Sequence, residues 1–320
     1  MNILTSLARF FSSGLYDYNK YKVDILKAVL PFIVILGHLY QEGIMCLSIF
    51  VDLTIIAMFL FFAMSGYGLV ISYITKKDYL NGFLSRSLLK LYLPYIFVFI
   101  LFVIYRFFHG IDQIELLKTV GLMSFIPTSW YIYVLSFLYI AFYVCFKYIR
   151  FYDSNFVKYN TILKSVIVCL VIFAYCFIAP HIGISHWRYD KCPAFCVGVF
   201  FALFNNSFLR KGKRLHVILF LFCAFLLIPP HGMIKPFIYP FIVFNLLYIV
   251  EIKTVNRIIK FLSSISLEMF IIQFLPIYIV IQDIGVNNPK LSIPFVFILD
   301  IIMGYLLHLL VNKIFKKIRK

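Results

Sequence analysis

A lysine and a histidine in the first long apolar segment fall on one face of the helix that this segment predicts. Lys27 precedes His38 by eleven residues, and at about 100° per residue the two side chains come within roughly 20° of the same stripe. A rise of about 1.5 Å per residue separates them by roughly 16 Å, which is about half of the ~30 Å hydrocarbon core of a membrane. This face therefore predicts a cation at the membrane surface and an imidazole near the midplane, where polar groups are costly and are candidates for function.

An aspartate extends this polar stripe. Asp24 lies close to the same helix face as Lys27. The structural alternative is a lysine that snorkels to the surface beside an aspartate, with a histidine that bonds a neighbouring helix. The shared face favours the catalytic interpretation of Asp24, Lys27 and His38.

Small residues are concentrated in the second apolar segment, which includes Ser65, Gly66, Tyr67 and Gly68. Such residues let a neighbouring helix approach closely. A narrow passage for a substrate or cofactor would require the same small side chains. Helix packing and cofactor binding by Ser65, Gly66 and Tyr67 therefore both remain open.

Two basic residues begin the third apolar segment. Arg86 and Lys90 are four residues apart and so are neighbours on one helix face. Adjacent cations at a membrane surface suit phosphate groups, which a soluble ligand or lipid headgroups would both supply.

The composition is that of a polytopic helical membrane protein. Apolar residues make up 63% of the 320 residues, above the roughly 45–50% of soluble domains, and the mean hydropathy is +0.97. Long unbroken apolar runs exclude a β-barrel, whose strands alternate. We expect an all-α fold of about ten transmembrane helices in one integral-membrane domain over residues 1–320. The expected spans lie near 26–43, 48–73, 88–108, 129–146, 162–180, 192–208, 215–230, 235–250, 261–282 and 293–312.

The formal charge of +17 is explained by membrane topology, so we expect no nucleic-acid partner. With both termini in the cytoplasm, all but six of the 30 Lys and Arg residues fall on the cytoplasmic side, as the positive-inside rule requires. The six in outer loops are Arg106, Lys118, Arg188, Lys191, Lys235 and Lys290. Residues 1–22 lack the cleavage site after a short apolar core that marks a signal peptide. Leu4, Leu7, Phe10 and Phe11, with Arg9 between them, form an amphipathic pattern, so we expect an interfacial or cytoplasmic segment.

The cysteines give no indication of a metal site. Cys192 and Cys196 are one helical turn apart, but no histidine or cysteine lies near them at metal-ligand spacing. We therefore expect no metal cofactor.

The early segments, in this order, resemble the membrane-bound acyltransferase 3 family. The resemblance extends over nearly the whole chain. It has two departures. Arg86 and Lys90 are spaced as Arg-x-x-x-Lys where members often have Arg-x-x-Arg, and Gln273 lies near the place of a histidine in many members. The residues that carry the resemblance are Asp24, Lys27 and His38; Phe61 through Tyr67; Arg86 and Lys90 before Pro94; Ser129, Trp130 and Tyr131; Phe195 through Val199; and Leu262 through Phe270.

The resemblance implies an O-acyltransferase that moves an acyl group, usually acetyl, from cytoplasmic acyl-CoA to a hydroxyl of an extracytoplasmic carbohydrate. His38 would be the general base, with Asp24 orienting Lys27. Arg86 and Lys90, with Lys27 as a further contact, would hold the CoA phosphates beside the Ser65-Gly66-Tyr67 passage. The implied location is the inner, plasma membrane, and the implied acceptors are capsule, O-antigen or exopolysaccharide, with membrane lipids as the other partners.

Four further residues are candidates for binding the acceptor. Trp130 could stack on a sugar ring or belong to an aromatic membrane belt. The outer loop with Trp187 and Arg188 is rich in stacking and hydrogen-bonding groups. Glu268 is expected to face the bundle interior, as is Asp300, whereas His308 is interpreted as a packing residue.

Two other functions fit the composition. A flippase or transporter of a lipid-linked glycan would require internal repeat symmetry and interrupted helices in both halves. A polysaccharide polymerase would require a large outer loop with several arginines. The sequence has neither feature, so an enzyme is favoured.

Overall fold

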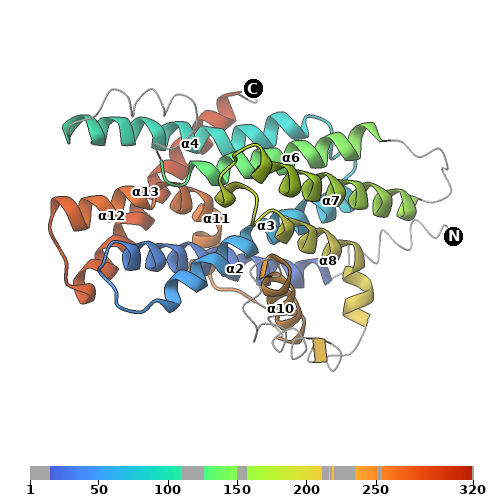
Figure 1. Ribbon diagram of the computed structural model, residues 1–320, viewed down its shortest axis with the longest axis horizontal. Coiled ribbons are helices and arrows are strands. Elements are labelled where there is room, and N and C mark those ends of the chain that lie inside the picture. Colours follow the sequence, from blue (N-terminus) through green and yellow to red (C-terminus); the bar gives the residue numbers. More distant parts are fainter. Residues whose placement is uncertain are drawn as a thin grey trace. The chain divides into compact units, whose positions relative to one another are not determined.

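The computed structural model describes residues 15–109, 126–149, 157–210, 216, 218–219, 235–250, 252 and 254–318. These residues form ten α-helices with short 3-10 and π-helical turns (Figure 1). The helices are α2 (Leu15–Gln41), α3 (Ile49–Thr75), α4 (Phe83–Phe108), α6 (Ser129–Tyr148), α7 (Val157–His181), α8 (Pro193–Arg210), α10 (Lys235–Ile249), α11 (Arg257–Ile272), α12 (Phe274–Tyr278) and α13 (Pro289–Ile318).

The predicted all-α membrane architecture is confirmed for the described part of the chain. Six of its helices are long and apolar enough to cross a membrane: α2, α3, α4, α6, α7 and α13. The bent pair of α11 with residues 274–283 makes a seventh if it counts as one span, and Lys235–Leu247 is a shorter apolar helix. The predicted seventh span near 215–230 and the N-terminal segment up to residue 14 lie largely or wholly outside the described residues. The count of ten spans and the side on which the termini lie remain predictions.

The chain divides into two compact units, each of which is described by itself. The first unit comprises Met1–Val23, Met58–Arg86 and Val134–Thr254, and the second comprises Asp24–Ala57, Ser87–Tyr133 and Val255–Lys320.

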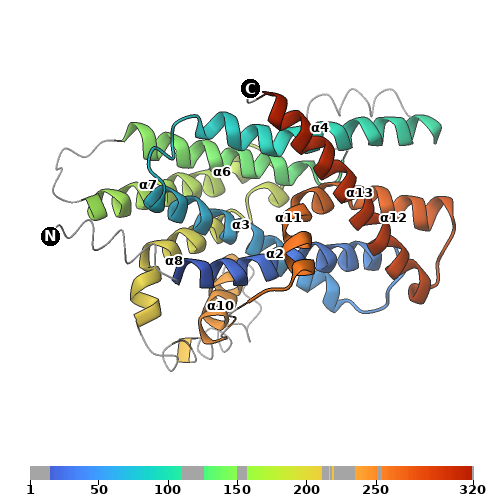
Figure 2. The ribbon, with the colours of Figure 1, turned by 180° about the vertical axis from the view of Figure 1, so that it is seen from behind.

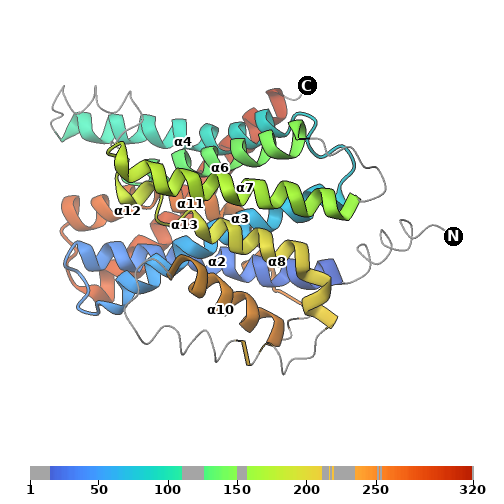
Figure 3. The same ribbon diagram turned by 45° about the vertical axis from the view of Figure 1, so that its right-hand side comes forward.

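In the first unit, glycines bring α3 and α8 into backbone contact. A Cβ atom at Gly198 would collide with the carbonyl oxygen of Ala63, and one at Gly66 would collide with the carbonyl oxygen of Phe195. Helix α8 also packs against α7 and α10, which lie on either side of it (Figure 3). The small residues of α3 are therefore used, at Gly66, for close helix packing.

In the second unit, α11 and α13 pack against each other (Figure 2). Two contacts and one shared cluster relate the positions of α11 and α12 to those of α13. His308 bonds Glu268, Gly304 lies against Met269, and Val296 joins the buried cluster that contains Ile277. Residue numbers rise along one helix as they fall along the other, so residues near 300 on α13 lie at the level of residues near 273.

The predicted ninth span is broken rather than straight. Helix α11 ends at Ile272, and the helical segment that starts at Phe274 is turned from it by 61°. Pro276 gives the physical reason, because it has no N–H for the Ile272 carbonyl one turn earlier. The bend lies next to Gln273, whose side chain is fully buried.

Candidate active site

Helix α2 carries the three residues of the predicted catalytic stripe. A contact with α11 in the second unit fixes Asp24, the first of the three. The Ser263 hydroxyl on α11 donates a hydrogen bond of 3.0 Å to Oδ1 of Asp24. This contact ties the start of the first span to the ninth. It also fixes the position of a carboxylate next to Lys27, which follows on the same helix.

A second lysine lies within electrostatic reach of the first. The charges of Asp24 and of Lys90, on α4, both act on the Lys27 ammonium group. Two lysines and one aspartate leave the group with a net positive formal charge. A cluster of this kind can hold an anionic group that approaches the membrane surface.

His38 lies further along α2 and is half-buried. Its Nδ1 atom lies 3.0 Å from Oε1 of Gln41, and its ring centroid lies 4.3 Å from that of Phe274. An amide oxygen can only accept, so with Gln41 in this orientation the ring proton is on Nδ1 and the lone pair is on Nε2. That tautomer allows Nε2 to take a proton from a bound hydroxyl group.

Close packing at Gly37 supports the position of His38. A side chain at Gly37 would collide with Thr54 on α3. The Thr54 hydroxyl bonds the carbonyl oxygens of Phe50 at 2.8 Å and of Ile33 at 3.2 Å, and so links α3 to α2. The helix that carries the imidazole is therefore fixed one residue before it.

Arg86 and Lys90, the predicted phosphate-binding pair, are one turn apart on α4, and both side chains are exposed. The Arg86 guanidinium donates a hydrogen bond of 3.1 Å to the Tyr79 carbonyl oxygen within the first unit. This contact turns the guanidinium toward the short connection before α4.

The other predicted cofactor residues lie on α3 in the first unit. The Ser65 hydroxyl donates to the Phe61 carbonyl at 3.0 Å and also interacts with Tyr139. Tyr67 is buried, and its ring lies 5.7 Å from that of Phe244. Packing accounts for Gly66, and cofactor binding by Ser65, Gly66 and Tyr67 remains a prediction.

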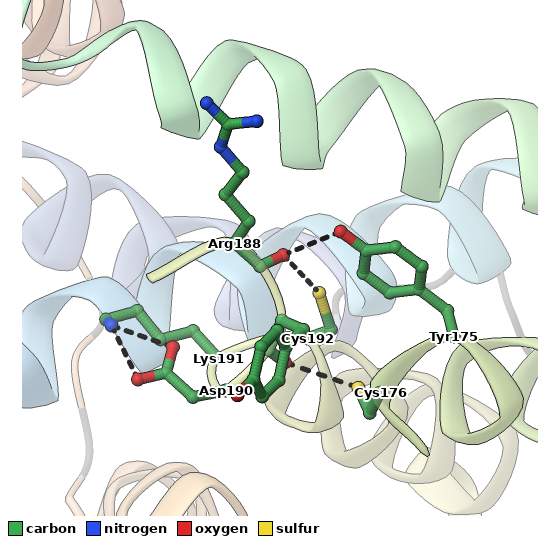
Figure 4. Close-up of polar contacts among 7 residues, drawn as sticks. Tyr175, Cys176, Arg188, Asp190, Lys191 and Cys192 are labelled. Carbon is green, nitrogen blue, oxygen red and sulfur yellow. Dashed lines mark hydrogen bonds and ion pairs between the residues drawn. The ribbon is translucent and has the colours of Figure 1, made fainter. Parts of the chain in front are cut away.

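The predicted acceptor loop is an ordered turn anchored to α7 (Figure 4). The Arg188 carbonyl accepts from the Tyr175 hydroxyl at 3.2 Å and from the Cys192 thiol at 3.6 Å. The Arg188 side chain extends away from these groups (Figure 4). Trp187 is 48% exposed, and the Lys191 ammonium lies 4.5 Å from its ring centroid. The loop thus presents an aromatic ring on a fixed backbone.

The remaining acceptor candidates belong to the second unit. Trp130 is half-buried at the start of α6, beside Tyr131, whose ring lies 4.6 Å from that of Phe270. Buried Glu268 accepts a hydrogen bond of 2.8 Å from Nδ1 of His308, and Nε2 of His308 lies 2.8 Å from the Asn312 amide nitrogen. His308 is therefore the partner of a buried carboxylate, and the interpretation as a packing residue was incomplete.

Sequence reasoning did not assign roles to Gln41, Ser263 and Phe274. Their contacts to His38 and Asp24 cross between helices or depend on side-chain orientation, which helix periodicity does not report. Within the described ranges, no cluster of three or more His, Cys, Asp or Glu residues could hold a metal ion.

Comparison with known proteins defines the class of enzyme. A family model described as an acyltransferase domain, of the acyltransferase 3 type, matches residues 20–312. The match includes every candidate residue on α2, α3, α4, α6 and α11. The chain belongs to this family, and it is a membrane acyltransferase. No curated protein and no solved structure matches the sequence significantly.

Proposed function

We propose that this acyltransferase moves an acetyl group from cytoplasmic acetyl-CoA to a hydroxyl of a surface or lipid-linked carbohydrate. The observation that carries the proposal is the arrangement of α2. This helix carries the imidazole of His38, which Gln41 orients. It also carries Lys27, roughly 16 Å away at about 1.5 Å per residue. Lys27 shares a charged cluster with Asp24 and Lys90.

His38 is the general base in this mechanism. Its Nε2 atom takes the proton from the acceptor hydroxyl as the oxygen attacks the thioester carbonyl. The tetrahedral intermediate then expels the CoA thiolate, and the imidazolium returns the proton to sulfur. Gln41 keeps the proton on Nδ1 and so holds the imidazole in the tautomer that this step requires.

Lys27 and Lys90, with Arg86, bind the phosphates of the donor. Both lysines lie in one net-positive cluster, and phosphates form strong charge-assisted hydrogen bonds with such groups. The pantetheine arm is long and slim, and a distance of roughly 16 Å along the helix is within its reach. Asp24, held by Ser263, fixes the position of Lys27.

The acceptor enters from the opposite side of the membrane. Trp187 and Arg188 in the anchored loop are proposed contacts in the first unit, and Trp130 and Glu268 are proposed contacts in the second. An exposed indole can stack on a sugar ring, and a guanidinium can bond several hydroxyl groups. The implied acceptors are capsule, O-antigen or exopolysaccharide, and the implied location is the plasma membrane with both termini in the cytoplasm.

Analysis of surface glycan from a deletion strain tests this proposal. We expect the glycan to lose O-acetyl groups while its chain length and amount at the surface stay unchanged. Restoration by the intact gene is the control. Loss of the glycan from the surface would indicate a flippase, and a change in chain length with acetylation intact would indicate a polymerase.

A further inference from the structure

Among the described residues of the second unit, two buried side chains have no hydrogen-bond partner for any of their polar atoms. Gln273 and Asp300 both have zero exposure. Neither the amide oxygen nor the amide nitrogen of Gln273 is bonded, and the same is true of both carboxylate oxygens of Asp300. Buried polar groups in folded proteins nearly always have a hydrogen-bond partner, because a buried group without one costs free energy. Two such residues therefore indicate a place where a polar ligand group binds.

The register of α11 and α13 places these two residues at the same level. On one side Gly304 lies against Met269, with the nearest side-chain atom 2.9 Å from the position of a Cβ. On the other side Val296 and Ile277 belong to one buried cluster. Asp300 is one turn from Gly304, and Gln273 is one turn from Met269, so both residues lie at the level between these two points.

This level of the unit is also that of His38. The ring of Phe274, the residue after Gln273, lies 4.3 Å from the imidazole ring, centroid to centroid. Ile35 and Leu39 of α2 belong to the cluster of Val296 and Ile277. The break between α11 and α12 thus lies beside the proposed general base.

The chemistry of the unbonded groups selects the kind of ligand. A primary amide offers donors and an acceptor side by side. The matching ligand group is another amide, which accepts through its carbonyl and donates through its N–H. The donor of the proposed reaction carries such an amide close to the thioester sulfur, and it must reach the level of His38 for the thioester to react.

We infer that Gln273, with Asp300 at the same level, binds the amide of the thioester donor that lies nearest to the reacting carbonyl group. This inference rests on the proposed function. The Gln273 amide oxygen accepts from the ligand N–H, because the N–H and the carbonyl of a trans secondary amide point in opposite directions and only one of them can face this side chain. This bond holds the acetyl group beside the helix break, next to Nε2 of His38. Gln273 is a donor-binding residue in this account, and Asp300 completes the polar site.

The test uses two small acetyl donors that differ at one position. S-acetyl-N-acetylcysteamine retains the amide, and 2-(acetylthio)ethyl acetate replaces its N–H by an ester oxygen. Purified full-length protein is assayed with each, either as the acetyl donor or as a competitor of acetyl-CoA. We expect the wild type to prefer the amide about tenfold or more in kcat/KM or in inhibition, the range of losing one well-made hydrogen bond in a buried site. The Gln273→Met variant, of similar length, should show a preference near one.

This ratio does not depend on the fraction of protein that is folded. Gln282→Leu, at an exposed position of the same unit, is the control and should keep the preference. If Gln273→Met does not fold, Gln273→Asn moves the amide by one methylene group and should lower the preference in the same direction. An unchanged preference in the Gln273 variants, or no preference in the wild type, would overturn the inference. Absence of transfer from acetyl-CoA in the wild type would instead refute the proposed function.

Discussion

The cation cluster of Lys27 on α2 and Lys90 on α4 is the feature that most directly suggests an anionic ligand. The charges of Lys90 and Asp24 both act on Lys27, and the single carboxylate leaves this cluster with a net positive formal charge. Lipid headgroups and CoA phosphates would both serve. Substitution of a lysine in the cluster would raise the KM for acetyl-CoA if the ligand is CoA phosphate, and would leave it unchanged if the ligand is a lipid headgroup.

Lys90→Gln should raise the KM for acetyl-CoA about tenfold or more, because a charge-assisted bond contributes roughly 1.5–3 kcal/mol. The kcat should change little, since the phosphates lie far from the reacting carbonyl group. Initial rates at varied acetyl-CoA with purified protein measure both. Lys290→Gln, at an exposed position of the same unit, is the matched control. An unchanged KM in Lys90→Gln would assign the cluster to lipid headgroups.

Exchanging two residues distinguishes between two alternative roles of Lys27, which are anchoring the helix at the interface and binding the donor. Exchanging Val23 with Lys27 moves the ammonium group one turn, about 6 Å, along the helix. A lysine that only anchors the helix at the interface would work equally well there. If Lys27 binds the donor beside Asp24, activity in the exchange variant should stay as low as in Lys27→Ala. Full recovery of acetyl transfer would exclude Lys27 from the site.

At the scale of single helices, the sequence predicted most positions and missed how the helices break and pair. The expected spans near 48–73 and 129–146 correspond to α3 and α6, because long apolar runs report helices directly. The 61° break in the ninth span was missed, although Pro276 was a usable signal. The bonds of Asp24 to Ser263 and of Glu268 to His308 join residues far apart in the chain, and no local pattern encodes such partners.

Gly66 and Gly68 give a paired test of helix packing on α3. Gly66 faces the Phe195 backbone, whereas nothing lies within 4 Å of a Cβ at Gly68. Gly66→Ala should therefore lower the unfolding temperature, since overpacking costs about 1–3 kcal/mol. Gly68→Ala should leave it unchanged or raise it, because alanine is the better helix former by about 1 kcal/mol. Thermal unfolding in detergent compares them, and equal effects would contradict this packing.

At the scale of the whole molecule, composition and charge distribution predicted the membrane class, and the family match over residues 20–312 confirms the acyltransferase. The acceptor was not predictable in the same way. In the proposed function, its specificity would depend on the positions of a few side chains in short loops such as the one after α7. Those positions follow from backbone anchoring by Tyr175 and Cys176, which the sequence does not reveal.

The distribution of lysine and arginine predicts that both termini lie in the cytoplasm. A reporter that is active only in the cytoplasm, fused after Lys320, should therefore be active. The same reporter inserted after Ser185, in the predicted outer loop, should be inactive. Activity of the inserted reporter, or inactivity of the C-terminal fusion, would contradict the predicted topology.

The central claim is that His38 is the general base, and acetyl transfer by purified protein tests it most directly. Labelled acetyl-CoA and surface glycan from a deletion strain are the substrates. His38→Ala should lose about 10²–10⁴ in rate, the usual contribution of a general base, while acetyl-CoA affinity and unfolding temperature stay close to those of the wild type. A His38→Ala protein that folds, binds acetyl-CoA and transfers acetyl at a near-normal rate would contradict the account.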